Sequence, residues 1–192
     1  MTQGTLDLAL PEISVLITCY FEEKSIDEFY TQLASAMKSL DRSYEIVFVN
    51  DGSTDGTFQK LESIYSKDPS VYAIIDLFRN SGQTAAQTAA FEHLRGECLV
   101  VMDSDLQLDP SEIKYLMNKY DDGYDIVSGC RRNRKDALMR IIPSRIANII
   151  MRKISRSNLK DFGCTFKAMR MALIRGGGYG PFKPWLAVDV IA

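Results

Sequence analysis

Two acids separated by a single residue follow directly after an apolar run. The apolar run is Val100-Val101-Met102, the acids are Asp103 and Asp105, and an amide, Gln107, comes two residues later. The run predicts a buried strand, and in an extended strand tip alternate side chains point to the same side. Two carboxylates on one side repel each other unless a cation lies between them, and hard oxygen ligands suit Mg²⁺ or Mn²⁺. A solvated acidic turn before a helix that starts at Asp109-Pro110 would show the same residues, so both interpretations stay open.

The elements that must position these acids are predicted to alternate between strand and helix. Apolar, β-rich runs predict strands over 13–19, 44–49, 71–78, 97–102 and 125–128. Helical spacing predicts helices over 25–40, 57–67, 81–95 and 110–120, with Gly96 as the C-cap of the third helix. This alternation predicts an α/β fold with a mostly parallel sheet and helices on both faces. Ligands bind at the carboxyl ends of the strands in such sheets, and three polar clusters lie there, over 20–23, 50–55 and 103–107.

The net charge of −2 conceals a strongly basic segment. Between Arg131 and Lys160 there are ten Lys and Arg residues and one acid, Asp136. Such a segment favours an anionic partner, which could be nucleic acid, a phosphate group or an anionic membrane surface, but it could also be a solvated helical face. Within it a helix is predicted to begin at Pro143-Ser144, with an apolar stripe bordered by bases. A helix of this kind lies either in a membrane interface or, more commonly, against a protein core.

Several classes of protein are disfavoured by what the sequence lacks. No apolar run is long enough for a transmembrane helix, and the N-terminus has no basic-then-apolar secretion leader. The four cysteines are scattered and form no C-x-x-C pair, which argues against a zinc site or a disulfide framework and fits a reducing cytosol. No G-x-G-x-x-G follows the first predicted strand, which argues against a dehydrogenase. No helix-turn-helix or aromatic-interleaved pattern supports nucleic-acid binding.

Six short segments together resemble one enzyme family. They are residues 17–23, 49–57, 79–86, 102–107, 133–136 and 143–148. The chain is similar to the family 2 glycosyltransferases of the GT-A fold, and within them to the dolichol-phosphate mannose synthase and undecaprenyl-phosphate glycosyltransferase branch. The resemblance extends from about residue 13 to residue 170. Several ordered motifs at proper spacing are more specific than any one of them alone.

The resemblance implies a site for a nucleotide-sugar donor, which would be a UDP-sugar or a GDP-sugar. Thr18, Tyr20 and Glu22 would line the nucleotide pocket, with Glu22 reaching the ribose hydroxyls. Val49 and Asp51 would hold the base, and the carboxylate of Asp51 would accept a hydrogen bond from a ring N–H. A strand-to-helix turn with a local helix cap would use the same residues around Asp51, and both roles can hold at once.

The same resemblance implies a divalent ion against the diphosphate of the donor. Asp103, Asp105 and Gln107 would hold Mg²⁺ or Mn²⁺, which makes the two acids the predicted catalytic residues. Ser104 would pack beside the ribose. The ion would neutralise the charge that grows on the leaving nucleoside diphosphate.

On the acceptor side, Arg131, Arg140 and Ser144 match family positions that bind the phosphate of a lipid acceptor. An arginine fork suits a phosphate group. The implied reaction moves the sugar onto a polyprenyl phosphate, undecaprenyl or dolichyl, with inversion at the anomeric carbon. The acceptor phosphate needs no protein general base, because its second pKa is about 6 and it is mostly ionised already. Since this acceptor stays in the bilayer, we expect a cytoplasmic chain that is peripheral at the inner face of the membrane, with contacts through residues 138–154.

The C-terminal part is expected to depart from the family. Residues 1–130 should form the nucleotide-sugar and metal-binding part, and residues 131–192 the acceptor-side helices and an incomplete end of the same catalytic domain. Thr18 and Phe21 stand where the family usually has Pro and Asn, and residues 176–192 do not match it well, so the chain looks shortened, with no clear final element. Two rivals therefore remain: a family 2 transferase with a soluble or glycan acceptor, and a non-catalytic remnant. A homo-oligomer is compatible with the sequence.

Overall fold

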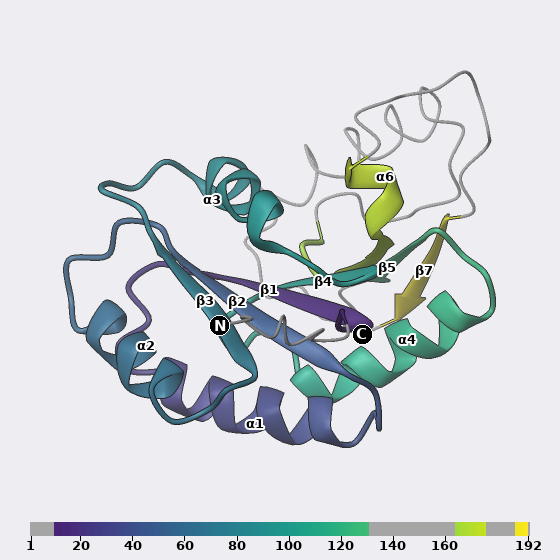
Figure 1. The fold of residues 1–192 in the computed structure, drawn as a ribbon, viewed down its shortest axis with the longest axis horizontal. Helices are drawn as coiled ribbons and strands as arrows, with labels where there is room; N and C mark the ends of the chain where they lie inside the picture. Colours follow the sequence, from purple (N-terminus) through teal and green to yellow (C-terminus); the bar gives the residue numbers. More distant parts are fainter. Residues whose placement is uncertain (1–9, 131–163, 176–186, 192) are drawn as a thin grey trace, which may run out of the picture.

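The computed structural model describes residues 10–130, 164–175 and 187–191, and Figure 1 shows their fold. The predicted basic amphipathic helix lies outside the described residues. The three predicted acceptor-phosphate residues, Arg131, Arg140 and Ser144, lie outside them as well. The division of the chain at residue 130 therefore stays a prediction.

The described residues form one sheet of seven strands in the order β3-β2-β1-β4-β6-β5-β7. Neighbouring strands β1, β2, β3 and β4 pair in parallel, as do β5 and β7, and among the described strands β6 alone runs antiparallel to its neighbours. The prediction of a mostly parallel sheet is confirmed. The strands are β1 Ile13–Cys19, β2 Tyr44–Asn50, β3 Val71–Asp76, β4 Cys98–Asp103, β5 Ile126–Cys130, β6 Lys167–Arg170 and β7 Ala187–Ile191.

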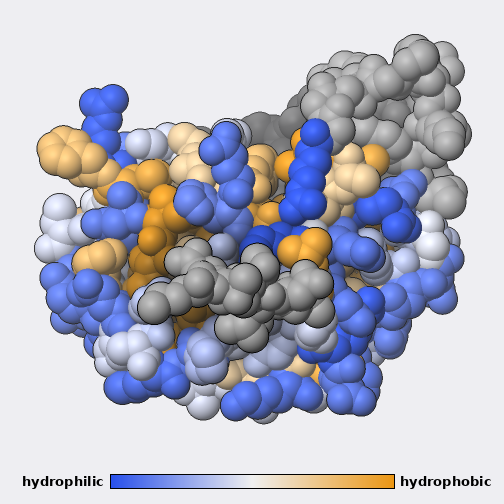
Figure 2. Space-filling model, in the orientation of Figure 1, coloured by the Kyte–Doolittle hydropathy of each residue, from blue (hydrophilic) through white to orange (hydrophobic). Residues whose placement is uncertain are grey.

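Helices cover both faces of this sheet, as predicted, and Figure 1 shows α1, α2 and α4 on one side and α3 and α6 on the other. Their apolar sides face the strands, and the outer surfaces along the lower edge of the view are mostly hydrophilic (Figure 2). The helices are α1 Ile26–Lys38, α2 Thr57–Tyr65, α3 Gln83–Ala90, α4 Ile113–Asp121 and α6 Met171–Arg175, with short 3₁₀ turns at Phe91–His93 and Pro110–Glu112.

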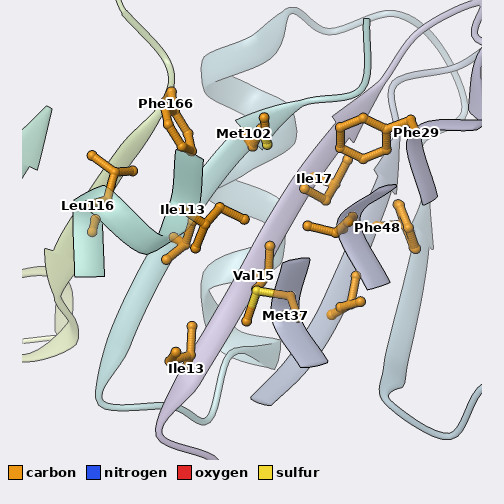
Figure 3. Close-up of a cluster of buried hydrophobic side chains, with 14 of the residues drawn as sticks. Ile13, Val15, Ile17, Phe29, Met37, Phe48, Met102, Ile113, Leu116 and Phe166 are labelled. Carbon is orange, nitrogen blue, oxygen red and sulfur yellow. The ribbon is translucent and has the colours of Figure 1, made fainter. Parts of the chain in front are cut away.

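The core lies in two layers because alternate residues of each strand point to opposite faces of the sheet. In β1, Val15 and Ile17 pack with Phe29 of α1 in the larger layer, which Figure 3 shows. Leu16 belongs to the other layer, where it packs with Ala86 of α3. All five side chains are at most 1 % exposed. A central strand that is buried on both faces fixes where its last residues, and the site beyond them, must lie.

Two details of the prediction are wrong at the third helix. The helix was expected to reach residue 95 with Gly96 as its C-cap, but α3 ends at Ala90 and Leu94 is extended. Gly96 instead lies against β1, where an added Cβ would be 2.6 Å from the backbone nitrogen of Ser14. The Gly96 N–H donates to the hydroxyl of Ser14 at 2.8 Å. Close packing of two backbones therefore explains this glycine better than helix capping does.

The C-terminal part also differs from the prediction, which had no strand after residue 128 and no clear final element. Residues Lys167–Arg170 form β6, which lies between β4 and β5 and pairs with both. Residues Ala187–Ile191 form β7, which pairs in parallel with β5. Both strands are only four or five residues long. Pairing with strands far away in the sequence, which local periodicity does not reveal, specifies them.

Candidate functional site

A pocket of about 250 Å³ lies at the carboxyl ends of β1, β2 and β4, beside the start of α3. The three polar clusters singled out in the sequence each contribute to it, as the parallel strand order requires. Most of its polar lining comes from acids, amides and hydroxyl groups. The lining residues are Thr18, Cys19, Tyr20, Glu22, Asp51, Asn80, Gly82, Gln83, Asp103, Ser104 and Asp105.

Asp103 accepts hydrogen bonds from three side chains that belong to three different parts of the chain. Its Oδ1 accepts from the Thr18 hydroxyl of β1 at 2.9 Å and from the Gln83 amide of α3 at 2.5 Å. Its Oδ2 accepts from the hydroxyl of Thr165 at 2.6 Å. Thr165 lies two residues before the start of β6. The carboxylate is therefore oriented from both of its oxygens, and these bonds link β1 to the segment before β6, on the other side of β4.

Asp105 lies in the exposed loop that follows β4 and has a different environment. Its Oδ1 accepts the backbone N–H of Gln107 at 3.0 Å, an Asx-turn in which Leu106 between them has a φ of 56°. Left-handed backbone is uncommon for leucine and often marks functional loops. The Gln107 side chain is exposed and does not line the pocket, so its predicted place beside the ion stays a prediction.

The residues present fit a divalent ion that is shared with a bound phosphate group. Among the described residues, no group of three or more His, Cys, Asp or Glu side chains could hold a metal ion. Mg²⁺ and ions like it commonly use only one or two protein carboxylates and complete their shell with water and substrate phosphates. Asp103 and Asp105, both at the pocket, supply that number of carboxylates. Such a site would depend on the ligand for the rest of its oxygen atoms.

Asp51 is 5 % exposed and anchors the loop that precedes α3. Its Oδ1 accepts the backbone N–H of Ser81 at 2.7 Å, and its Oδ2 accepts the backbone N–H of Gly82 at 3.0 Å. The two bonds bring Asn80 and Gly82 to the pocket wall. Because a carboxylate offers about four acceptor positions, these bonds leave room for the predicted hydrogen bond from a base.

Gly52 makes this anchoring possible, and its replacement by Ala should destabilise the fold. Its φ is +70°, and an added Cβ would lie 2.3 Å from the carbonyl carbon of Arg79. We expect Gly52→Ala to lower the free energy of unfolding by about 2–3 kcal/mol, since strained backbone and a backbone clash add. The measurement is equilibrium unfolding in urea.

Gly123→Ala is the matched control for this substitution. Gly123 also has a left-handed φ, of +96°, but an added Cβ would meet nothing within 4 Å. The control should therefore cost only the backbone strain, about 1–2 kcal/mol. If both variants lower the free energy of unfolding equally, the close approach of Gly52 to Arg79 adds nothing to the cost of the substitution.

The loop after β1 forms the other wall of the pocket. The backbone N–H of Glu22 donates to the hydroxyl of Thr57 at 2.9 Å, and its carboxylate accepts from the hydroxyl of Ser25. Tyr20 is 46 % exposed at the rim and lies edge-on to Phe21, which has a left-handed φ of 59°. Glu22 is thus held in place from two sides, while the Tyr20 ring offers an open face to a ligand.

The floor of the pocket is formed by the last residues of β1 and the residue after β4. Ser104, 1 % exposed, donates from its hydroxyl to the backbone carbonyl of Thr18 at 3.1 Å. Burial raises the pKa of the Cys19 thiol to about 12, so this thiol is protonated and unreactive at neutral pH. The floor can therefore contact a ligand through packing and hydrogen bonds, and its Cys19 thiol is not a nucleophile.

The structure brings most of the predicted donor residues together at the pocket. Val49 does not line the pocket, because its side chain is fully buried among apolar residues under α3. The sequence does not predict the places of Asn80, Gln83 and Thr165. Asn80 and Gln83 belong to the family-like segment 79–86, which signals a site without showing their contacts, and nothing in the sequence marks Thr165. Those brought together at the pocket are Thr18, Tyr20, Glu22, Asp51, Asp103, Ser104 and Asp105.

Comparisons with known proteins agree with this geometry. The sequence profile of the family described as Glycosyl transferase family 2 matches residues 14–177. An undecaprenyl-phosphate 4-deoxy-4-formamido-L-arabinose transferase of Pseudomonas paraeruginosa is 37 % identical over 162 residues, which are 84 % of this chain and 48 % of that protein. The protein of the same name from Salmonella choleraesuis is 34 % identical over 165 residues, 86 % of this chain and 50 % of its own length. The chain thus spans about half the length of these curated relatives.

Solved structures share the fold at much lower identity. Glucosyl-3-phosphoglycerate synthase from Mycobacterium tuberculosis, in complex with Mn²⁺, UDP and phosphoglyceric acid, has a TM-score of 0.69 at 17 % identity over 94 % of this chain and 68 % of that one. A mannosyltransferase from Pyrobaculum calidifontis, in complex with GDP-mannose and Mn²⁺, has a TM-score of 0.63 at 19 % identity over 96 % of this chain and 57 % of that one. The fold is therefore the GT-A fold that the sequence predicts.

Proposed function

Because the chain belongs to glycosyl transferase family 2, we propose that it moves a sugar from a nucleotide diphosphate donor to a polyprenyl phosphate. The observation that supports this most directly is the convergence of Glu22, Asp51, Asp103 and Asp105 from three strand ends on one pocket. The names of the relatives support the acceptor, since they are undecaprenyl-phosphate transferases. The donor would carry UDP or GDP, and the reaction would invert the anomeric centre.

In this proposal the chain's own residues bind and orient the donor. Asp51 would accept a base N–H, Glu22 would accept from the ribose hydroxyls, and Ser104 would pack beside the ribose. Asp103 and Asp105 would hold Mg²⁺ or Mn²⁺, which when bound supplies positive charge against the leaving diphosphate. Two solved neighbours in complex with Mn²⁺ and with UDP or GDP-mannose support a divalent ion in general.

The acceptor side of the proposal depends on the basic segment from Arg131 to Lys160. Arg131, Arg140 and Ser144 would hold the acceptor phosphate, whose ionised oxygen would attack without a protein base. Holding the two reactants in line would supply much of the rate gain. The apolar and basic residues at 138–154 would place the chain against the inner face of the membrane. Within the described ranges, no helix is both long and apolar enough to cross a membrane.

An acceptor assay with lipid vesicles tests this proposal. We expect the chain to sediment with anionic vesicles that contain undecaprenyl phosphate, less so as salt rises, because exposed charges are screened. With Mn²⁺ and a UDP- or GDP-sugar, the sugar should pass to the lipid at least about 10²-fold faster than to free sugars, because only the lipid carries the phosphate that the arginines would orient. The measurement is label transfer to the lipid fraction.

Vesicles without the prenyl phosphate are the control for non-specific label in the lipid fraction. Transfer to free sugars or glycans in place of the lipid would favour a family 2 transferase with a soluble acceptor. Donor binding without transfer to any acceptor would favour a non-catalytic remnant. Either result would overturn the proposed acceptor.

A further inference from the structure

The hydroxyl of Thr165 reaches the Asp103 carboxylate from a part of the chain that is far away in the sequence. Thr165 lies 62 residues after Asp103 and two residues before the start of β6. The bond of 2.6 Å joins a hydroxyl to an ionised oxygen, the kind of hydrogen bond that is about twice as strong as a neutral one. Thr165 itself is partly buried.

The backbone on either side of Thr165 is fixed. Cys164 and Phe166 are both 1 % exposed and belong to the main core. The Gly129 N–H of β5 donates to the Phe166 carbonyl at 2.8 Å, and a Cβ on Gly129 would lie 2.9 Å from the Phe166 ring. Because the neighbouring side chains fill the core, Thr165 has little freedom to move away from Asp103.

The three donors leave different numbers of free acceptor positions on the two carboxylate oxygens of Asp103. Each carboxylate oxygen has about two acceptor positions. Thr18 and Gln83 fill those of Oδ1, whereas Thr165 fills one of the two on Oδ2. Among the described contacts, Oδ2 is therefore the oxygen that keeps a position for a ligand.

The donors also differ in how firmly they are held. Thr18 and Thr165 have β-branched side chains with restricted χ1, and Thr18 is in the central strand β1. Gln83 has a long, exposed side chain at the first position of α3. The two threonines therefore fix the plane of the carboxylate, and Gln83 is the least firmly held of the three donors.

We infer that Thr165 is a positioning residue of the donor site. Its hydroxyl holds Oδ2 of Asp103 so that the remaining acceptor position of this oxygen serves the divalent ion and its shell. Thr165 acts through Asp103 and does not itself touch the donor. The inference rests on the proposed function, because it concerns the same nucleotide and ion site.

The test compares two substitutions of Thr165 in the full chain. Thr165→Val keeps the shape and removes the hydroxyl, and Thr165→Ser keeps the hydroxyl. Calorimetric titration with UDP and with GDP, each with and without Mn²⁺, is the measurement. In Thr165→Val the affinity gained on adding Mn²⁺ should fall about tenfold, with the affinity in the absence of Mn²⁺ unchanged. Thr165→Ser should stay within about twofold of the wild type.

Thr31→Val is the matched control, since the Thr31 hydroxyl bonds only to the Asp27 carbonyl on the exposed side of α1. Thermal unfolding of all three variants shows whether a loss of binding comes from a loss of folded protein. Equal Mn²⁺-dependent binding in Thr165→Val and the wild type would overturn the positioning role. An equal loss of Mn²⁺-dependent affinity in Thr165→Val and Thr165→Ser would also overturn it, because the cause would then be altered packing and not the hydroxyl. If the wild type binds neither nucleotide, the proposed function fails first, and this inference fails with it.

Discussion

Replacing Asp105 by Asn is expected to lower sugar transfer about 10³-fold and to remove the Mn²⁺-dependent part of nucleotide binding. Asp105 is an exposed carboxylate at the pocket. The substitution keeps the size of the side chain, and an amide oxygen can still accept the Gln107 N–H, so the turn after β4 should persist. What is lost is the negative charge that would attract and hold a divalent ion. Calorimetric titration of UDP and of GDP, with and without Mn²⁺, measures the binding, and label transfer to lipid measures the rate.

Asp109→Asn is the matched control, because it removes the same charge four positions further on, at a residue that does not line the pocket. Asp109 caps the turn at Pro110–Glu112, and Asn caps such turns nearly as well. A chelator added to the wild type should reproduce the binding of Asp105→Asn. Undiminished Mn²⁺ dependence in Asp105→Asn would place the ion elsewhere, and no nucleotide binding in the wild type would remove support for the transferase.

The structure gives Asp103 and Asp105 different environments, although their spacing predicts equivalent roles. Asp103 is partly buried and receives three side-chain donors. Asp105 is exposed, in a loop whose left-handed Leu106 turns the chain. Strand alternation predicts that the two carboxylates share a side of the sheet. Asp105 lies two residues after the end of β4, so its direction depends on a turn that alternation does not describe.

The location of the site could be predicted because it depends on local periodicity and one general rule. Buried runs ending at Cys19, Asn50 and Asp103 form parallel neighbours, so the polar residues after them must meet at one edge. For this reason Asp51 and Asp103 could be placed in one pocket before any contact was known.

The contacts that complete the site could not be predicted in this way. Thr165 reaches Asp103 only because β6 lies between β4 and β5, and a strand of four residues has too short a pattern to be recognised. Gly96 looked like a helix C-cap because glycine often is one, whereas its reason is the backbone of Ser14. In both cases the cause lies in a partner more than 60 residues away.

At the opposite end of the sheet, Arg95→Met is expected to lower the free energy of unfolding by about 3 kcal/mol. Arg95 pairs with Glu45 of β2 at 2.6 Å and lies 3.7 Å from the centre of the Tyr72 ring. The Glu45 side chain is only 2 % exposed, so without its cation it would remain as a buried charge. We take the lower end of the cost for breaking a buried pair. The reasons are that Arg95 is 33 % exposed and that the Ser14 hydroxyl still donates to Glu45 at 2.7 Å.

The control is Arg42→Met, which removes an arginine from two ion pairs whose acids, Glu12 and Asp121, are 51 % and 56 % exposed. Because such pairs are solvated, it should cost about 1 kcal/mol or less. Combining Arg95→Met with Glu45→Gln should recover part of the loss, since a buried amide needs no cation and can keep hydrogen bonds from Ser14 and the residue 95 backbone. Urea unfolding of the wild type and of the three variants measures these free energies. If Arg95→Met costs no more than Arg42→Met, or if the double variant is less stable than Arg95→Met, the cost does not come from an unpaired charge at Glu45.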